Sequence, residues 1–181
     1  PASIAPVGGT TPVIGTNPFA LAVPDGSGSV AFTIDQSASV VAKSEIMMHA
    51  RAGKPIPSGW ALDAEGNTTT DAETALMGSM VPNGGHKGFG AGLMVETFAA
   101  ALAGATLGRD ASAFAGTAGG PPRTGQFFLA ISPDHFSGGA FGARVSDLAQ
   151  AINDQSGARL PGSQRRLNRS LCDRNGITVE E

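Results

Sequence analysis

The sequence predicts a mixed α/β or α+β fold, and three observations lead to that prediction. Two β-prone runs, "FALAV" at 19–23 and "VAFTI" at 30–34, flank the turn-rich loop "PDGSGS". Several later segments carry apolar residues at three- and four-residue spacings, which is typical of helices. The 26 glycines and 12 prolines are spread among apolar runs, which indicates many tight turns in a folded chain.

The first helix is expected from about Ser39 to Ala52, where Val40, Val41 and the methionines follow helical spacing and Gly53 provides a stop. Residues 54–76 have the composition of a loop. Within them a short helix is expected to start after Asp71, whose carboxylate is a favourable cap, with an acidic residue in the first turn.

The clearest helical pattern follows the glycine-rich stretch. Its expected apolar face consists of Phe89, Leu93, Met94, Phe98, Leu102 and Ala105. The run "GQFFLAISP" at 125–133 predicts a buried strand. Residues 142–155 predict an amphipathic helix with Val145, Leu148, Ala149 and Ile152 on one side. The last 17 residues predict a helix ending near Gly176, followed by a short strand.

Composition excludes several classes of function. A length of 181 residues fits one domain, or one domain and part of another. The net charge of -3 gives no general attraction to nucleic acid or to an anionic membrane, and no apolar run reaches the roughly 20 residues needed to span a bilayer. The single cysteine, Cys172, cannot form an internal disulfide, so a cytoplasmic protein is expected. Because the chain opens at Pro1 within a strand-rich segment, a fragment or a processed product is one interpretation.

The stretch "GGHKGFGAG" at 84–92 places His86 and Lys87 among glycines at the start of a helix. It contains neither G-x-G-x-x-G nor G-x-x-x-x-G-K-[ST]. A helix N-terminus with unpaired N–H groups and a nearby lysine still suits an anion. The alternative is a flexible turn with a solvated lysine, and spacing leaves both interpretations open.

Three other patterns are also ambiguous. In "TIDQSAS", Ser37 or Ser39 can cap the following helix, or the segment can bind a ribose or phosphate. Glu45 can orient or recharge a proton donor, or be a surface charge. Five arginines between 159 and 174 suit phosphate or RNA, or form a solvated helix face. The histidines show no metal-ligand spacing, so no metal is expected.

Six segments occur in the order found in one family: "GTNPFALAVP", "IDQSASVVAKSEI", "GWALDAEGNTTTD", "PNGGHKGFGAGLMVE", "FFLAISPDHF" and "RLPGSQR". The chain thereby resembles the malate/L-lactate dehydrogenase-like oxidoreductases, a family that includes Δ1-piperideine-2-carboxylate/Δ1-pyrroline-2-carboxylate reductases and sulfolactate dehydrogenases. The resemblance implies a nicotinamide-dependent, homodimeric, cytosolic enzyme. It also implies a non-Rossmann NAD(P)-binding fold with a largely antiparallel sheet flanked by helices.

The resemblance assigns expected roles residue by residue. The cofactor-binding residues that it implies are Asp35, Gln36, Ser37, His86, Lys87, Gly162, Ser163, Gln164, Arg165, Arg166, Leu167 and Asn168. The substrate-side residues are Thr16, Lys43 and Ser44. Glu45 falls where imine reductases of the family have an acidic charge-relay residue. Two departures from the pattern are Glu45, where aspartate is usual, and Ser44, where glycine is more frequent.

The family's proton-donating histidine, its serine partner and a substrate-binding arginine precede the first matched motif, and this sequence has no matching segment. Residues 1–140 are therefore expected to form the NAD(P)-binding domain. Residues 141–181 are expected to form a C-terminal helical segment that packs with a missing N-terminal part of the same polypeptide.

The predicted function is NAD(P)H-dependent reduction of a small cyclic 2-imino acid, Δ1-piperideine-2-carboxylate or Δ1-pyrroline-2-carboxylate, to L-pipecolate or L-proline. NADP(H) is expected ahead of NAD(H), because the arginine cluster suits a 2′-phosphate. The alternatives are a malate/L-lactate-type 2-hydroxy acid dehydrogenase acting on a keto acid, and a catalytically incomplete nucleotide-binding fragment.

Overall fold

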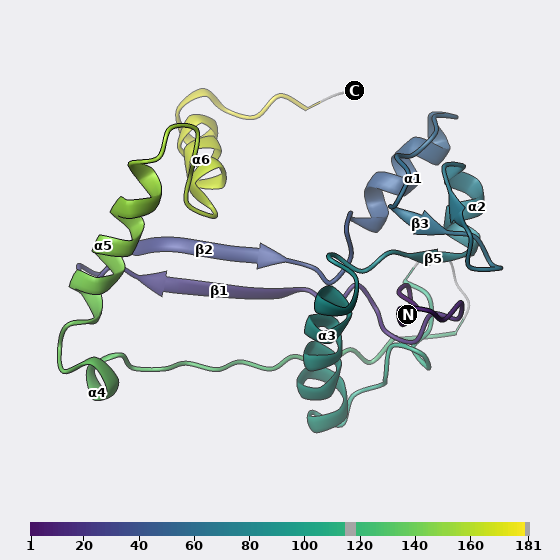
Figure 1. Ribbon diagram of the computed structural model, residues 1–181, viewed down its shortest axis with the longest axis horizontal. Helices are drawn as coiled ribbons and strands as arrows, with labels where there is room; N and C mark the ends of the chain where they lie inside the picture. The colour runs from purple at the N-terminus through teal and green to yellow at the C-terminus, as the bar shows by residue number, and fades with distance from the viewer. Residues whose placement is uncertain (115–118, 180–181) are drawn as a thin grey trace. The chain divides into compact units, whose positions relative to one another are not determined.

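The computed structural model of the chain describes residues 1–114 and 119–179, and it is a mixed α/β structure whose sheets are antiparallel (Figure 1). The predicted fold class is confirmed. The chain divides into two compact units. Unit 1 comprises residues 1–18 and 37–128, and unit 2 comprises residues 19–36 and 129–181. The expectation that residues 141–181 pack against a preceding domain stays a prediction.

Unit 2 is built on the predicted hairpin. Strands β1 (Phe19–Pro24) and β2 (Val30–Gln36) pair antiparallel from Phe19 opposite Gln36 to Pro24 opposite Val30 (Figure 1). The Asp25 carboxylate closes the connecting loop by accepting hydrogen bonds from the backbone N–H groups of Ser27 and Ser29 at 2.8 and 3.1 Å. The short β-prone runs and the turn residues between them therefore form the expected hairpin.

Three helices complete unit 2: α4 (Asp134–Ser137), α5 (Phe141–Asn153) and α6 (Ser163–Asn175). The start of α5 lies against the hairpin loop, where a Cβ atom at Gly142 would come within 3.3 Å of the Asp25 carbonyl oxygen. The predicted helices near 142–155 and up to Gly176 are confirmed. Residues 177–179 form no strand, and the rest of the strand predicted there, residues 180–181, lies outside the described residues.

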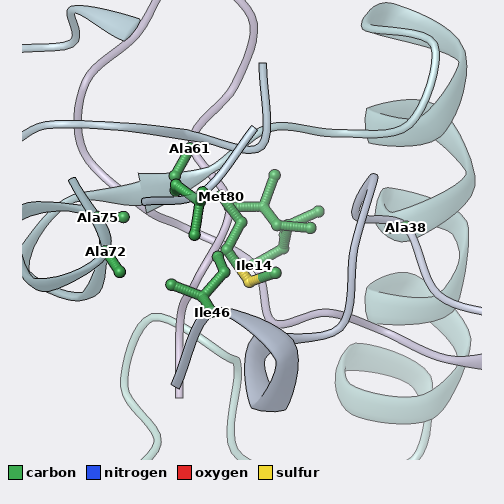
Figure 2. Close-up of a cluster of buried hydrophobic side chains, with 9 residues drawn as sticks. Ile14, Ala38, Ile46, Ala61, Ala72, Ala75 and Met80 are labelled. Carbon is green, nitrogen blue, oxygen red and sulfur yellow. The ribbon is translucent and has the colours of Figure 1, made fainter. Parts of the chain in front are cut away.

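Unit 1 has a small three-stranded antiparallel sheet in which β3 (Ala61–Leu62) lies between β4 (Thr68–Thr69) and β5 (Ser79–Met80). Helices α1 (Lys43–Arg51) and α2 (Ala72–Met77) pack beside it (Figure 1). The core between these elements, shown in Figure 2, consists of Ile4, Ile14, Ala38, Ile46, Ile56, Ala61, Ala72, Ala75 and Met80. Strands β3 and β4 lie in the stretch that the sequence predicts to be a loop. The sequence does not reveal them because a two-residue strand is too short to show an alternating pattern.

Helix α1 begins at Lys43, four residues later than predicted. The preceding residues pair with another segment instead: Val40 N–H donates to the Val81 carbonyl at 2.9 Å, and Ser39 forms a β-bridge with Pro82. These pairings join Ser39 and Val40 to the segment at 81–82 before the helix begins. Tertiary hydrogen bonds therefore override the helical spacing at the start of this segment.

The helix after the glycine-rich stretch starts as α3 (His86–Val95) and continues as a π-helix, η1 (Glu96–Leu102). The expected apolar face is largely exposed in the structure, since Leu93, Met94 and Leu102 are 49%, 49% and 67% exposed. The buried residues are small ones, Gly88, Gly92 and Ala100. The helix approaches the rest of unit 1 with its backbone rather than with large side chains.

The buried strand predicted at 125–133 is also wrong. Those residues form no strand in the structure, and Phe128, Leu129 and Ile131 are 84%, 73% and 64% exposed. A strand requires a neighbour for its N–H and C=O groups, and no strand within residues 1–114 and 119–179 pairs with this segment. Phe127 instead stacks on Phe98 of η1, with ring centroids 4.8 Å apart.

Asp71 caps α2, and the cap provides a pH-dependent test of the fold. Its carboxylate accepts a hydrogen bond from the Thr74 N–H at 2.7 Å. Hydrogen bonding from the Thr74 side chain and backbone lowers the pKa of Asp71. A lowered pKa in the folded state means that the cap stabilises above the unfolded-state pKa of about 3.9, and that this contribution is lost as pH falls through the folded value.

We therefore expect Asp71→Ala to lower the melting temperature at pH 7 by about 2–4 °C, with a smaller decrease at pH 3. Asp71→Asn is the matched control, because an asparagine side chain still caps a helix. Differential scanning calorimetry at both pH values measures the effect. Equal decreases for both variants at both pH values would contradict the capping role.

Candidate functional site

The candidate region in unit 1 is the glycine-rich lead-in to α3. Gly84 and Gly85 both have φ of 64°, a conformation that glycine adopts without strain. Helix α3 then begins at His86, and no side chain caps its N-terminus. His86 and Lys87 are exposed in the first turn. Backbone N–H groups without a side-chain cap, a lysine and the positive end of a helix suit an anion.

The lead-in is held in place by close backbone contact with α3. A Cβ atom at Gly88 would lie 2.2 Å from the Asn83 carbonyl oxygen and 2.7 Å from its backbone nitrogen. No side chain fits in that space. Gly88 therefore sets the path of residues 83–85 immediately before the exposed His86 and Lys87.

Main-chain hydrogen bonds place Thr16 and Ser37 beside this lead-in. The Ala38 N–H donates to the Thr16 carbonyl at 2.8 Å, and the Ala38 carbonyl accepts from the Asn83 N–H at 2.8 Å. The Ser37 and Ser39 hydroxyl oxygens are 3.0 Å apart. Three segments distant in sequence thus lie side by side in unit 1.

Neither serine caps α1, which corrects one of the two interpretations of the "TIDQSAS" segment. The residue before the helix is Ala42, with no side-chain cap, and the buried Ser39 hydroxyl donates to the Val41 carbonyl at 2.7 Å. The helix start is displaced to Lys43 by the pairing of Ser39 with Pro82. Ser37 is half-buried and remains at the edge of the lead-in.

Lys43, Ser44 and Glu45 form the first turn of α1 in unit 1. Lys43 and Ser44 are exposed. The Glu45 carboxylate lies 3.9 Å from His49 Nε2, one helical turn away. These three residues share one helix end, so they can act on the same small molecule.

His49 is a further candidate functional residue. Metal-ligand spacing in the sequence does not single it out. Its Nδ1 atom lies 2.7 Å from the Pro55 carbonyl oxygen, which can only accept, so Nδ1 carries a hydrogen. Its ring also packs edge-on against Trp60, with centroids 5.6 Å apart. The 3.9 Å contact of Nε2 with the Glu45 carboxylate is an ion pair only when the imidazole is protonated. The i, i+4 spacing of Glu45 and His49 on a helix is the sequence signal for this pair.

A second candidate region, described by itself, is a cavity in unit 2 of about 460 Å³. It is lined by Thr33, Ile34, Asp35, Gln36, Arg159, Leu160, Pro161, Gly162, Ser163, Gln164 and Arg165. The structure thus brings Asp35 and Gln36, at the end of β2, together with residues 162–165. Arg166, Leu167 and Asn168 lie further along α6 and do not line this cavity.

The loop at Gly162 is docked tightly on β2. The Thr33 N–H donates to the Pro161 carbonyl at 3.3 Å, and a Cβ atom at Gly162 would lie 2.0 Å from Thr33 Oγ1. Gly162 has φ of 79° and precedes α6, whose N-terminus also has no side-chain cap. Only glycine fits both the conformation and the space.

Charges on the cavity wall are partly paired. Arg165 forms an ion pair with Asp35, and Arg166 donates to the Ala31 carbonyl at 3.2 Å. Arg159 donates to the Gln164 side chain at 3.3 Å. The cavity therefore offers both cationic donors and a carboxylate acceptor, a combination that suits a phosphate next to a sugar hydroxyl.

The part of the chain that the structure describes shows no group of three His, Cys, Asp or Glu side chains placed to hold a metal ion. Among those residues, no helix is long and apolar enough to cross a membrane.

The close contact at Gly88 yields a stability prediction. Alanine normally stabilises a helix interior by up to about 1 kcal/mol over glycine. We expect Gly88→Ala to destabilise the chain instead, by about 1–3 kcal/mol, because the new Cβ atom overlaps the Asn83 backbone. Gly90→Ala is the matched control, since nothing lies within 4 Å of its added Cβ atom. Urea denaturation measures both, and a Gly88→Ala variant as stable as Gly90→Ala would contradict the contact.

Known proteins were compared with this chain. A (2R)-3-sulfolactate dehydrogenase (NADP(+)) of Chromohalobacter salexigens is 46% identical over 165 residues, which cover 91% of this chain and 49% of that protein. A Δ(1)-pyrroline-2-carboxylate reductase of Ancylobacter novellus is 42% identical over 179 residues, covering 97% and 52%. The chain spans about half the length of these relatives.

A solved structure of Δ1-piperideine-2-carboxylate reductase from Pseudomonas syringae pvar. tomato matches with a TM-score of 0.88 and 31% identity, over 99% of this chain and 54% of that one. Sulfolactate dehydrogenase from Methanocaldococcus jannaschii matches with a TM-score of 0.80 and 30% identity, over 99% and 53%. A family model described as malate/L-lactate dehydrogenase matches residues 1–181. The chain belongs to the malate/L-lactate dehydrogenase family.

Proposed function

We propose that this chain carries the cofactor-binding part of a cytoplasmic, homodimeric NADPH-dependent oxidoreductase that reduces a small cyclic 2-imino acid to L-pipecolate or L-proline. The observation that carries the proposal is the α3 N-terminus in unit 1. There, N–H groups without a side-chain cap and Lys87 follow a lead-in whose path is set by the Gly88 contact. Relatives named as Δ(1)-pyrroline-2-carboxylate reductases, 42% identical, support the substrate class.

Each unit, taken by itself, carries groups that suit part of a phosphorylated nucleotide. In unit 1, His86 and Lys87 offer a ring donor and an ammonium group to an anion. In unit 2, Arg159 and Arg165 offer guanidinium groups, and Asp35 can accept from a ribose hydroxyl. A phosphate at Arg165 has to compete with Asp35, with which Arg165 is paired. The name of the sulfolactate dehydrogenase relative includes NADP(+), which supports NADP(H) ahead of NAD(H).

When bound, NADPH supplies the hydride that reduces the C=N carbon of the substrate. The residues of this chain orient the substrate and handle charge. Lys43 pairs with the substrate carboxylate, and Thr16 and Ser44 provide hydroxyl groups for its orientation. Glu45 acts as the acidic charge-relay residue that orients the group protonating the imine nitrogen, and its carboxylate lies 3.9 Å from His49 Nε2 on the same helix.

A second candidate is a 2-hydroxy acid dehydrogenase, and the relative at 46% identity named as a sulfolactate dehydrogenase favours it. In the reduction of a keto acid, the atom that is protonated is the keto oxygen, whereas in an imino acid it is the imine nitrogen. The same helix end would then face a keto acid, and Lys43 would again pair with its carboxylate.

Cofactor binding is tested with Lys87→Ala in the full chain. Removing one charge-assisted contact to a phosphate is expected to raise the dissociation constant for NADPH about ten- to a hundredfold. Lys54→Ala is the control, because Lys54 is also exposed in unit 1 but lies in the loop after α1. Titration of NADPH fluorescence measures both, and an unchanged constant for Lys87→Ala would count against the site.

Substrate class is tested by steady-state oxidation of NADPH. We expect kcat/KM for Δ1-piperideine-2-carboxylate or Δ1-pyrroline-2-carboxylate to exceed that for pyruvate, oxaloacetate and sulfopyruvate by at least about tenfold, a difference of about 1.4 kcal/mol. The reverse order would establish the hydroxy acid alternative. Binding of NADPH with no turnover of any of these would indicate a nucleotide-binding fragment.

A further inference from the structure

Glu96 lies at the junction of α3 and η1 and ends the segment "PNGGHKGFGAGLMVE", in which the family resemblance assigns roles to His86 and Lys87 but none to Glu96. Its two carboxylate oxygens accept hydrogen bonds from different segments of unit 1. One accepts from the Asn17 side-chain amide at 2.8 Å, and the other from the Gly108 N–H at 2.6 Å. Glu96 therefore joins the loop before β1 and the loop after η1 to one point on the helix.

Asn17 depends on this contact for its conformation. It has φ of 44°, in the left-handed region that most residues with a side chain avoid. Its side-chain nitrogen donates to both Glu96 and the Gly92 carbonyl, each at 2.8 Å. Both hydrogens of the amide are thereby used, and the residue is anchored to the helix at two successive turns.

The space around Asn17 is closely packed. A Cβ atom at Gly15 would lie 2.8 Å from Asn17 Oδ1, and one at Gly108 would lie 2.9 Å from the Gly15 nitrogen. The loop at 15–17 is thus enclosed between α3, the Glu96 carboxylate and the Gly108 turn. Asn17 therefore cannot move far without displacing these neighbouring atoms.

The next residue toward the N-terminus is Thr16, whose carbonyl accepts from Ala38 N–H at 2.8 Å. Ala38 in turn accepts from Asn83 N–H at 2.8 Å. Any movement of Asn17 therefore reaches Thr16 directly through the chain and the Ser37 segment through one hydrogen bond. A π-helix starts at Glu96, and such segments are rare and frequent at functional sites.

We propose that Glu96 is a positioning residue for substrate binding: through Asn17, its carboxylate holds Thr16 at the orientation in which it contacts the substrate. This inference rests on the proposed function for the role of Thr16. A carboxyl group suits this position better than an amide, because both partners are donors and an amide offers an acceptor at only one of its two terminal atoms.

The test compares Glu96→Gln with wild type in the full chain. The glutamine keeps the size of the side chain but presents its NH₂ group to one of the two donors. We expect KM for the imino acid to rise about tenfold, with kcat and the dissociation constant for NADPH changed less than about twofold. Amide hydrogen exchange at Gly108 and Ala38, followed by NMR, is expected to quicken about tenfold.

Two further variants make the test specific. Glu65→Gln removes a charge from an exposed turn of the same unit and should change neither KM nor the exchange rates. Asn17→Gly removes the amide while tolerating the positive φ. The double variant Asn17→Gly/Glu96→Gln should raise KM about as much as one change alone, because both changes break the same contact.

An unaltered KM in Glu96→Gln, with a wild-type chain that turns over, would overturn the inference, whether or not exchange becomes faster. A hundredfold rise in the double variant, the product of two independent effects, would also overturn it. A wild-type chain that binds NADPH but turns over none of the tested acids would indicate a nucleotide-binding fragment and would overturn the substrate role of Glu96. These failures are distinguished by the wild-type assay.

Discussion

The close approach of the α3 backbone to its neighbours is the constraint on which the rest of unit 1 depends. Gly92 leaves no room for a side chain against Ile14 and Ala38, and Gly88 leaves none against Asn83. The helix can therefore contact three chain segments through main-chain atoms. The loop at 14–17, the segment at 37–39 and the lead-in to α3 meet there, and they contain most of the candidate residues of unit 1. Apolar burial by large side chains contributes less at this contact, since several are exposed.

The candidate residues are consequently held by main-chain hydrogen bonds and by a few paired charges. Ala38 joins Thr16 to Asn83 through its own N–H and C=O groups. In unit 2, Pro161 is bonded to the β2 backbone, and Asp35 is paired with Arg165 on the cavity wall. Such arrangements place chemical groups accurately without consuming the side chains that contact a ligand. They leave the side chains of Lys43, His86 and Lys87 exposed.

Relatives with similar sequences carry names with different substrates, a sulfonated hydroxy acid in one and a cyclic imino acid in another. Both substrates are small carboxylates with a reducible or oxidisable carbon next to the acid group. The names of these relatives thus agree on a small acid and differ in the bond that is reduced or oxidised. In this chain the first turn of α1 places the Glu45 carboxylate 3.9 Å from His49 Nε2.

The sequence by itself determined the hairpin, the capped α2, the helices near 142–155 and 163–175, and the family, because each has a local signature. Turn residues, a cap and a 3.6-residue period require no knowledge of distant neighbours. Tertiary structure decided three other features: the late start of α1 at Lys43, the exposure of the segment at 125–133, and the burial of glycines on α3. These three outcomes depend on pairing with a distant segment, on the lack of a neighbouring strand in the described residues, and on close backbone contact. None of them produces a periodic pattern in the sequence. For the same reason Glu96 and His49 became visible only once their partners were in place.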